Sequence, residues 1–340
     1  MKKLAILSML TIVLFIQNVE AQSDSYTLQK DVLFASPEGF GLTMDIYTPN
    51  TGKDSYPVVV IWHGGGWLIN TNDIMDEMSQ YLAEQGEFVV CNVNYRLLGD
   101  QNNTVTLDEI VEDVFGSLLW IKSNISAYKG DPNQIAVTGD SAGGHLAAMV
   151  VSHGKVLESD GFDGATFGFS PSWLPEGKTA EQVAAEDGLE VQAAIPSYGV
   201  FNMVMRAENG FETSQNGFWE WGGATPRGLF GEAFNVEKNP DIYEATSPIH
   251  NVSDTSEKKY PPMFFHVGSE DTTTPPEAIE AYVSKLKQAG QQVEYKVYEG
   301  KKHAYLDNGC NDYFQQCFAD DAVPVLNDMI TFLNNHLKRN

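Results

Sequence analysis

The amino-acid sequence predicts an α/β fold in which helices cover both faces of a mostly parallel central sheet. Continuous apolar runs at 57–62 and 262–267 are typical of strands that are buried on both faces. These runs alternate with segments of helical apolar spacing, such as 107–123, and this alternation indicates a parallel sheet. A chain of 340 residues with no internal repeat and no linker-like stretch favours one large domain.

The first 21 residues are expected to be a signal peptide. Lys2 and Lys3 precede an apolar run over 4–16, and Ala21 is a small residue at the expected cleavage point. The apolar run is shorter than the ~20 residues that a membrane-spanning helix needs, which disfavours the alternative of an uncleaved anchor. We therefore expect a secreted or periplasmic protein whose mature part, residues 22–340, is a single domain without stable membrane association.

The charge of the chain excludes one class of partner. The sequence has 46 acidic and 21 basic residues, which gives a formal net charge of −25. A surface of this sign repels nucleic acid and anionic lipid, so no nucleic-acid partner is expected.

The first half of the predicted domain alternates strands and helices. Alternating apolar residues over 26–47 suggest an antiparallel hairpin at the edge of the sheet, and Pro49 interrupts the pattern. The following elements are then expected in chain order: a strand at 57–62, a helix at 73–85, a strand at 88–95, a helix at 107–123, a strand at 134–138 and a buried helix that begins near His145.

Two regions of the second half break this alternation. Weak periodicity over 154–190 predicts an insertion at the upper rim of the sheet, and 201–240 combines large aromatic residues with glycine. The aromatic residues are expected either to form a lid or substrate wall, or only to pack the lid onto the body of the protein. The remaining elements are strands at 191–195, 262–267 and 293–298, and helices at 277–288 and 323–337.

A serine lies in a tight turn between a predicted strand and a predicted helix. Ser141 is the central residue of Gly139-Asp140-Ser141-Ala142-Gly143, which has the pattern G-x-S-x-G. In a nucleophile elbow the two glycines tolerate the cramped backbone, and the serine hydroxyl is exposed at the end of the strand. An ordinary Gly/Ser loop is the alternative, but the strand before and the helix after the turn favour the elbow.

A second glycine-rich turn follows the predicted strand at 57–62. Its three glycines, Gly64 to Gly66, let the backbone turn N–H groups toward a ligand, as an oxyanion hole requires. A flexible turn without such a role is the alternative. We predict an oxyanion hole made by the N–H groups of Gly65, Gly66 and Ala142.

A serine nucleophile needs a base to take its proton and a third group to orient that base. His303 follows the last predicted strand and Asp271 follows the strand before it, and residues beyond parallel strand ends converge on one crevice. We therefore predict Ser141 as nucleophile, His303 as base and Asp271 as acid. The six other histidines lie inside elements, in the glycine loop or away from strand ends, whereas the acid has three alternatives, Glu270, Asp307 and Asp254.

The chain has three cysteines. Cys310 and Cys317 are close together in a polar loop and could form a disulfide in an oxidising compartment, with two free thiols as the alternative. Cys91 lies in a predicted strand, where a buried inert thiol is expected. No H-E-x-x-H motif, EF-hand spacing or phosphate-binding glycine loop occurs, so no metal or cofactor is expected.

Seven motifs together resemble those of secreted carboxylesterases of the α/β-hydrolase fold. The chain is similar to hormone-sensitive-lipase-like esterases and, more closely, to the feruloyl and acetylxylan esterases of that fold. The motifs that carry the resemblance are His63–Trp67, Asn94–Arg96, Asp131–Asn133, Gly139–Gly144, Ala245–Pro248, Asp271 and His303.

The resemblance implies that a Ser-His-Asp triad hydrolyses a small-molecule or polysaccharide ester, with feruloyl or acetyl groups on plant polysaccharide as the expected substrate class. Amide or peptide hydrolysis by the same triad is one alternative, and a non-catalytic binding protein is another. The insertion at 154–190 and the loop between Cys310 and Cys317 depart from the family pattern, and both are expected to border the substrate entrance.

Overall fold

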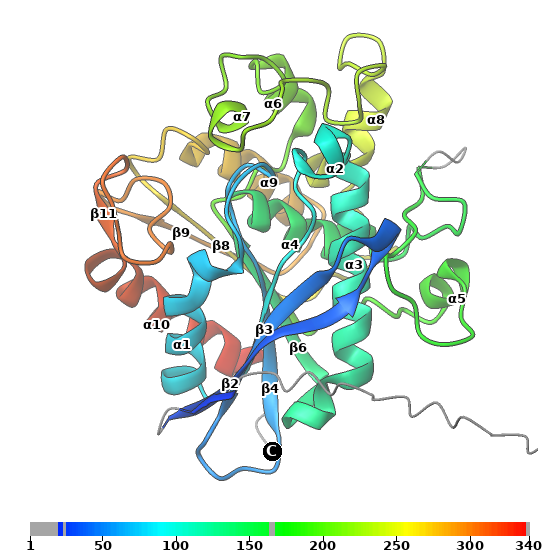
Figure 1. Ribbon diagram of the computed structural model, residues 1–340. Coiled ribbons are helices and arrows are strands. Elements are labelled where there is room, and N and C mark those ends of the chain that lie inside the picture. Colours follow the sequence, from blue (N-terminus) through cyan, green and yellow to red (C-terminus); the bar gives the residue numbers. More distant parts are fainter. Residues whose placement is uncertain (1–19, 23–24, 163–166, 338–340) are drawn as a thin grey trace, which may run out of the picture.

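The computed structural model describes residues 20–22, 25–162 and 167–337 (Figure 1). Of the predicted signal peptide, residues 1–21, all but Glu20 and Ala21 lie outside the described residues. Within the described part of the chain, no helix is both long enough and apolar enough to cross a membrane.

The described strands form one large sheet and one small hairpin. The order in the large sheet is β1-β2-β3-β5-β4-β6-β7-β8-β9, in which the six strands β5, β4, β6, β7, β8 and β9 run parallel to one another. At the other edge β1, β2, β3 and β5 pair antiparallel, and β10 pairs with β11 in the hairpin. The bounds are β1 Glu20–Gln22, β2 Tyr26–Ala35, β3 Leu42–Pro49, β4 Tyr56–Trp62, β5 Val89–Val93, β6 Gly130–Asp140, β7 Ala193–Ser197, β8 Met263–Gly268, β9 Val293–Tyr298, β10 Cys310–Asn311 and β11 Gln316–Cys317.

Helices cover both faces of the sheet, as the alternating pattern predicts. α1 and α10 contact each other on one face, whereas α3 and α4 contact each other on the other face, where α9 packs against β8 and β9 (Figure 1). The bounds are α1 Asp76–Gly86, α2 Asp100–Asn103, α3 Leu107–Asn124, α4 Ala142–His153, α5 Ala180–Ala185, α6 Met203–Glu208, α7 Phe218–Trp221, α8 Pro240–Ala245, α9 Pro276–Gln288 and α10 Phe318–His336. Short 3-10 turns occur at Pro37–Gly39, Asn72–Met75, Ile125–Tyr128 and Pro248–His250.

Burial explains why the central strands form where the sequence predicts them. Every residue of β4, β5, β7 and β8 is buried. A strand with helices over both faces has no solvent side, so its sequence can be apolar at successive positions. The predicted strands at 57–62 and 262–267 and the edge hairpin over 26–47 are therefore confirmed.

The closing helix begins earlier than the predicted 323–337. α10 starts at Phe318, and Pro324 lies inside it. Asp320 and Asp321 occupy its first turn, where negative charge is favourable at the positive end of the helix dipole. The Asp321 carboxylate also accepts the Cys317 N–H at 2.8 Å, so the helix N-terminus has a hydrogen-bond partner that apolar periodicity does not reveal.

The described part of 154–190 packs along α3. The Ser172 N–H donates to the backbone oxygen of Glu112 at 3.0 Å, and Phe169 meets Phe115 edge to face at 5.5 Å. Figure 1 places this segment, with α5, at the side of α3 that faces away from β8 and β9. The segment also reaches residues 201–240, because Phe162 stacks on the Phe230 ring at 5.7 Å. That it borders the substrate entrance stays a prediction.

Glu112 gives the attachment of this segment a pH dependence. Its carboxylate accepts the Ser170 N–H at 2.7 Å, and burial raises its pKa from 4.5 to about 8. Because the folded protein favours the protonated form of Glu112, the contribution of this residue to the free energy of unfolding is fully present below pH ~4.3. This contribution is lost as the pH rises through about 8. We expect Glu112→Gln to be more stable than the wild type at pH 9, by on the order of 2 kcal/mol, and to lose this advantage toward pH 4. Thermal melts across this range measure it, and parallel pH profiles would contradict it.

Residues 201–240, which we call the lid, cover the carboxyl ends of the strands with α6 and α7 (Figure 1). Phe211 and Trp219 are buried, and the Trp219 indole N–H donates to the Phe211 backbone oxygen at 2.7 Å. Trp221, in contrast, is 58% exposed. Some aromatic residues of the lid therefore pack it onto the body, as one alternative predicts, while Trp221 faces outward and the role of a substrate wall stays a prediction.

Candidate active site

Ser141 lies at the sharp turn between β6 and α4. Its φ of 49° falls in the left-handed region, which costs a non-glycine residue energy and persists only where the surroundings enforce it. One such constraint is the Ser141 N–H, which donates to the backbone oxygen of Ser197 at the end of β7 (3.0 Å). The turn therefore has the conformation of a nucleophile elbow, with the serine at the carboxyl end of the sheet.

The two glycines of the elbow are required by the end of β4. A Cβ on Gly143 would lie 1.8 Å from the backbone oxygen of Trp62, and one on Gly139 would lie 2.4 Å from the same atom. Both contacts are with backbone, which cannot move aside as a flexible side chain can. The G-x-S-x-G spacing thus reflects the close approach of the elbow to the neighbouring strand.

Gly143→Ala is expected to destabilise the fold by at least about 3 kcal/mol, because the new methyl group must displace β4. Urea unfolding measures the loss. Gly41→Ala is the matched control, since a Cβ at Gly41 meets only Leu33 at 3.5 Å, and its effect should stay within about 1 kcal/mol. Equal stability of the two variants would contradict the close approach.

Three side chains from separate strand ends form a continuous hydrogen-bonded chain. His303 Nε2 lies 2.9 Å from Ser141 Oγ, and His303 Nδ1 lies 2.7 Å from Asp271 Oδ2. All three residues are buried, with Ser141 at 9% exposure. A hydroxyl next to an imidazole that a carboxylate orients is the arrangement that activates a serine for nucleophilic attack. The structure thus brings together the nucleophile, base and acid that the sequence order predicts.

The loop after Asp271 holds its carboxylate in place. The N–H groups of Thr273 and Thr274 donate to Oδ1 at 2.8 and 2.9 Å. The Thr274 hydroxyl lies 3.1 Å from Oδ2 and 2.9 Å from the backbone oxygen of Tyr198. Sequence reasoning missed Thr274, although an aspartate that accepts N–H groups two or three residues later is a recognised turn pattern.

The rival histidines are structural. Burial lowers the pKa of His63 and His145 to about 4 and that of His266 to about 3, so these rings stay neutral. His266 Nδ1 lies 2.6 Å from the Tyr305 hydroxyl, and His145 Nε2 lies 2.9 Å from the backbone oxygen of Thr246. Among the described histidines, His303 alone contacts both a serine hydroxyl and a carboxylate.

Asp140 ties the glycine loop to the elbow. Its carboxylate accepts the Gly64 N–H at 2.6 Å, and the Tyr95 hydroxyl donates to the backbone oxygen of His63 at 2.6 Å. Asp140 is buried, which raises its pKa to about 6. The sequence motif did not predict this role. The feature that could have indicated it is an acidic residue at the variable position before the serine of G-x-S-x-G, directly after an apolar strand.

The N–H groups predicted for the oxyanion hole have no hydrogen-bond partner within the described part of the chain. No described residue accepts a hydrogen bond from the N–H of Gly65, Gly66 or Ala142. Gly65 has a φ of 114°, and a Cβ there would lie 2.3 Å from the backbone oxygen of Ile69, so only glycine fits. Unpaired donors on the two segments that Asp140 joins can stabilise a negative oxygen beside Ser141.

Four aromatic side chains form a row from the glycine loop to His303, which we call the aromatic wall. The ring centroids of neighbours are 5.2 Å apart for Phe218 and Trp221, 5.9 Å for Trp221 and Tyr313, and 4.9 Å for Tyr313 and Phe314. The row is anchored at both ends. At one end the Phe218 ring would lie 3.3 Å from a Cβ on Gly66, and at the other end the Phe314 ring centroid lies 5.5 Å from that of His303.

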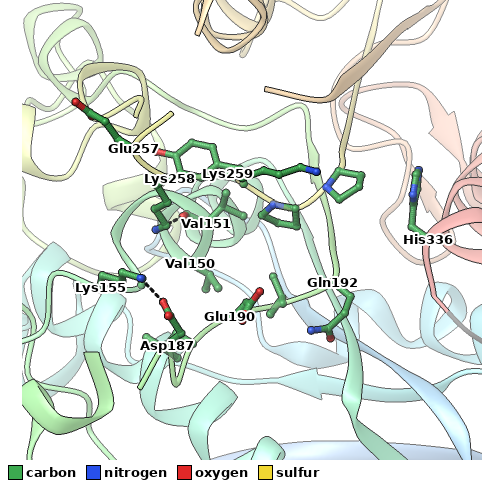
Figure 2. Close-up of a pocket in the computed structure, with 16 residues that line it drawn as sticks. Val150, Val151, Lys155, Asp187, Glu190, Gln192, Glu257, Lys258, Lys259 and His336 are labelled. Carbon is green, nitrogen blue, oxygen red and sulfur yellow. Dashed lines mark hydrogen bonds and ion pairs between the residues drawn. The ribbon is translucent and has the colours of Figure 1, made fainter. Parts of the chain in front are cut away.

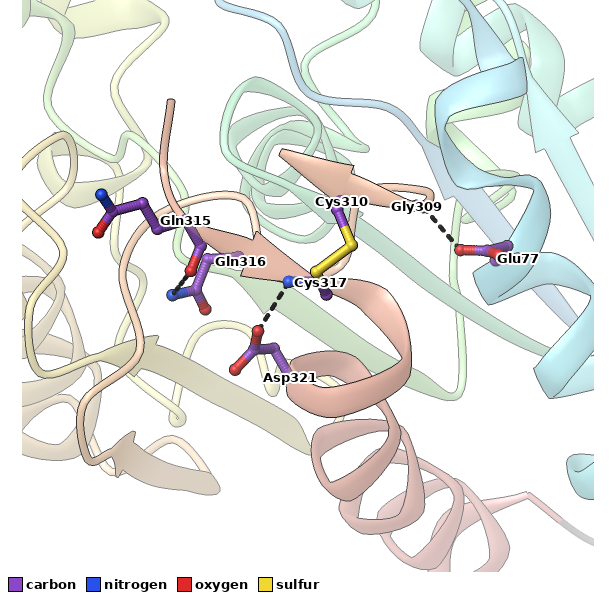
Figure 3. Close-up of a disulfide and its surroundings, with 7 residues drawn as sticks. All are labelled: Glu77, Gly309, Cys310, Gln315, Gln316, Cys317 and Asp321. Carbon is purple, nitrogen blue, oxygen red and sulfur yellow. Dashed lines mark hydrogen bonds between the residues drawn. A yellow bond between two sulfur atoms is a disulfide. The ribbon is translucent and has the colours of Figure 1, made fainter. Parts of the chain in front are cut away.

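A disulfide hairpin carries Tyr313 and Phe314. Cys310 and Cys317 are joined by a disulfide, and β10 and β11 pair beside it (Figure 3). The Gly309 N–H donates to Glu77 of α1 at 2.8 Å, which attaches the hairpin to the body (Figure 3). Since Phe314 contacts His303, this loop borders the site.

A cavity of about 580 Å³ lies at the opposite end of α4 (Figure 2). Val150 and Val151 of the last turns of α4 line it, whereas Ser141 precedes the first turn. Twelve helical residues span about 18 Å, so this cavity is separate from the triad. Two of its lysines also have partners, because Lys155 pairs with Asp187 at 2.5 Å and Lys258 donates to the Val151 oxygen at 3.0 Å.

The chain has relatives among known esterases. It is 27% identical over 290 residues to the isoprenylcysteine alpha-carbonyl methylesterase of Arabidopsis thaliana, covering 83% of this chain and 58% of that protein. It is 36% identical over 105 residues to the carboxylesterase NlhH of Mycobacterium tuberculosis, covering 31% of this chain and 32% of that protein. The chain spans about three fifths of the length of the plant relatives.

Solved structures of esterases have the same fold. Esterase 2 of Thermogutta terrifontis superposes with a TM-score of 0.62 at 21% identity, covering 91% of this chain and 95% of that one. A truncated carbohydrate esterase from gut microbiota superposes with a TM-score of 0.66 at 21% identity, covering 94% and 99%. Together with the sheet order and the elbow, these likenesses show that the chain has the α/β-hydrolase fold.

A family model matches most of the domain. The BD-FAE model covers residues 44–286, which include the glycine loop, Ser141 and Asp271, while His303 lies just beyond the match. The matched stretch is well over half of the 340 residues. This chain therefore belongs to the BD-FAE family.

Proposed function

We propose that this protein is a serine carboxylesterase that removes feruloyl or acetyl groups from plant polysaccharide. The observation that carries the proposal is the chain of hydrogen bonds from Ser141 through His303 to Asp271. The free N–H groups of Gly65, Gly66 and Ala142 supply the second requirement of acyl transfer.

The first step forms an acyl-enzyme. Ser141 Oγ attacks the ester carbonyl carbon while His303 Nε2 accepts the hydroxyl proton, and Asp271 stabilises the resulting imidazolium. The carbonyl oxygen becomes negative and is bound by the free N–H donors; the loss of one such donor typically costs about 2.7 to 4 kcal/mol of transition-state stabilisation. When the tetrahedral intermediate collapses, the C–O bond breaks and His303 gives its proton to the leaving alcohol.

The second step releases the acid. A water molecule attacks the acyl carbon while His303 again accepts a proton, and Ser141 leaves as the hydroxyl that His303 reprotonates. The same N–H donors bind the second tetrahedral intermediate.

The aromatic wall supports a substrate with a flat ring or sugar unit. Trp221 and Tyr313 are 58% and 75% exposed, although large aromatic side chains are usually covered. Their position between the glycine loop and His303 puts aromatic faces beside the reacting ester, where a phenolic ring can stack. The likeness to a carbohydrate esterase supports the same substrate class.

We propose a secreted or periplasmic location for this activity. The basic, apolar and small-residue pattern of residues 1–21 supports it. The disulfide between Cys310 and Cys317 supports it too, since disulfides persist in oxidising compartments. The working enzyme would then be residues 22–340, one domain with insertions at 154–190 and 201–240.

A substrate panel tests the activity. Purified protein is assayed on an aryl acetate, methyl ferulate, acetylated xylan and an aminoacyl anilide, with Ser141→Ala as the control. We expect turnover of the esters and none of the anilide. Turnover of the anilide alone would instead support the amidase alternative. Turnover of aryl acetate alone would support an esterase activity but contradict the proposed polysaccharide substrate.

Trp221→Ala and Tyr313→Ala test the aromatic wall. Each should raise KM for methyl ferulate about 3- to 10-fold, because stacking on an aromatic ring contributes roughly 1 kcal/mol. The loss should be smaller for aryl acetate, whose acyl group has no ring to stack. Steady-state kinetics on the two esters measure the ratio, and equal losses on both would reduce the wall to a packing role.

A further inference from the structure

A second cavity of about 560 Å³ lies next to the loop that carries the triad acid. Its walls are residues 199–202 after β7, the start of the lid at α6, the loop over 272–275 and the first turns of α9. Thr274 belongs to this wall and also holds the Asp271 carboxylate. A ligand in this cavity would therefore contact both the lid and the acid loop.

One wall residue, Arg206 of α6, has no hydrogen-bond or ion-pair partner among the described residues. Its Nε is buried and bonds to nothing, and no described residue accepts a hydrogen bond from its guanidinium. The other two described arginines, in contrast, have ion-pair or hydrogen-bond partners. Arg96 pairs with Asp113 at 2.8 Å and Glu109 at 2.9 Å, and Arg227 donates to backbone oxygens, including that of Asn103 at 2.8 Å.

An unpaired guanidinium in a partly buried place is costly. Burying a charge without a partner carries a large desolvation penalty, and burial lowers the pKa of Arg206. The protein has 46 acidic residues, yet none of the described ones forms an ion pair with Arg206. Glu277 lines the same cavity but is exposed and makes no ion pair there. A ligand that brings its own negative charge would relieve the penalty.

The cavity around Arg206 combines further polar groups with apolar ones. Asn209 and Thr273 line it and carry side-chain groups that can donate hydrogen bonds. Met205, Ile249 and Ala281 supply an apolar surface. This mixture suits a small organic anion with a carbon skeleton, because a few polar groups orient such a ligand and the apolar surface covers the rest.

Arg206 is also linked to the glycine loop. Its guanidinium lies 4.7 Å from the centroid of the Phe211 ring, and Phe211 meets Trp67 edge to face at 5.5 Å. Trp67 directly follows Gly66 in the chain. The cation thus contacts a ring on one side, while no described residue accepts a hydrogen bond from its N–H groups.

We propose that this cavity is a binding site for a carboxylate, and that Arg206 is the residue that recognises it. The guanidinium fork matches the two oxygens of a carboxylate, which lysine cannot do. Two sources have this chemistry: a uronic acid unit of a polysaccharide, and a free aromatic acid of the kind that ester hydrolysis would release. The site goes beyond the proposed esterase function and does not require it.

Equilibrium binding to the Ser141→Ala protein tests the proposal without any turnover. Glucuronate and ferulate are titrated by calorimetry, with their uncharged methyl esters as matched probes. We expect at least one acid to bind at least about 10-fold more tightly than its ester, since a charged hydrogen-bonded pair is worth more than a neutral one. The acid that binds identifies the source. Failure of both acids to bind, or equal binding of acid and ester, would overturn the site.

Variants at Arg206 locate the binding. In the same background, Arg206→Gln should weaken the acid about 10-fold or more, and Arg206→Lys should weaken it less because the charge is kept. Lys287→Gln on α9 removes the same charge from an exposed position. It should change the dissociation constant less than about twofold, because solvent and salt screen the interaction of an exposed charge with the ligand. Equal weakening by Arg206→Gln and Lys287→Gln would mean that only the overall charge matters.

Stability without ligand separates recognition from a structural role. Because Arg206 has no hydrogen-bond or ion-pair partner in the free protein and only the Phe211 ring beside its guanidinium, Arg206→Gln should melt close to the wild-type temperature. Ferulate or glucuronate should then raise the melting temperature of the protein with Arg206 but not of the variant. A variant that melts several degrees lower without ligand would contradict the proposal, since Arg206 would then stabilise the fold itself.

Discussion

Replacing Ser141 by alanine is expected to lower kcat for aryl acetate by about 10⁴- to 10⁶-fold. Ser141 Oγ is the atom that would bond to the acyl carbon, and it is the serine oxygen within 2.9 Å of His303 Nε2. The fold should be unaffected, because the elbow is held by backbone contacts, including the Ser141 N–H to the Ser197 oxygen. Initial rates and a thermal melt of the variant measure both expectations.

The matched control is Ser126→Ala, an exposed serine on the short turn after α3, which should retain wild-type rates. His303→Gln should be as damaging as Ser141→Ala, because the base and the nucleophile act as one unit. For the same reason the double variant should lose no more than either single one. If the losses in kcat of the two single variants were additive in the double variant, the two residues would not act as one unit. Wild-type turnover by Ser141→Ala would show that the triad does not catalyse the reaction.

The fold was predictable because its signals are local. A buried central strand must be apolar along its length, and a surface helix must be apolar on one side, so β4, β8 and α3 can be recognised from short stretches. The elbow is similarly local, since its glycines are required by the close approach of one neighbouring strand, which leaves no room for a Cβ. The triad could then be inferred from chain order, because parallel strands end at one edge.

What the sequence did not predict depends on contacts between distant segments. Asp140 and Thr274 support the site through bonds to Gly64 and Asp271, and nothing in their own sequence neighbourhoods fixes those partners. The position of 154–190 follows from its packing on α3, which weak periodicity does not indicate. Arg206 is the clearest case, because an absent partner can be seen only when the side chains around it are placed.

The aromatic wall combines both kinds of signal. The sequence indicates a lid rich in aromatic residues, and Trp221 belongs to it. Its neighbour Tyr313 comes from the disulfide hairpin, and the two rings lie 5.9 Å apart across the entrance. The proposed aromatic wall therefore rests on a contact between two irregular segments, one of which is held by the Cys310–Cys317 disulfide.

Asp271→Asn is expected to lower kcat about 10⁴-fold while leaving the fold intact. An asparagine keeps the shape of the side chain and can still accept the N–H groups of Thr273 and Thr274 through its oxygen. Its amide nitrogen would then face His303 Nδ1 as a donor, which favours the tautomer with the proton on Nε2. That tautomer cannot accept the Ser141 proton, and the neutral amide cannot stabilise the imidazolium.

The same experiment discriminates among the carboxylates near the strand end. Asp254 is exposed and accepts the Ser256 hydroxyl at 2.7 Å, and Glu270 is exposed, so Asp254→Asn and Glu270→Gln should retain wild-type kcat. Burial and the nearby Asp140 charge raise the pKa of Asp307 well above its usual range. The raised pKa disfavours the charged form of Asp307, and among the described carboxylates it is Asp271 that lies 2.7 Å from His303 Nδ1. A loss of 10³-fold or more in Asp307→Asn, with Asp271→Asn near the wild-type rate, would transfer the acid role to Asp307.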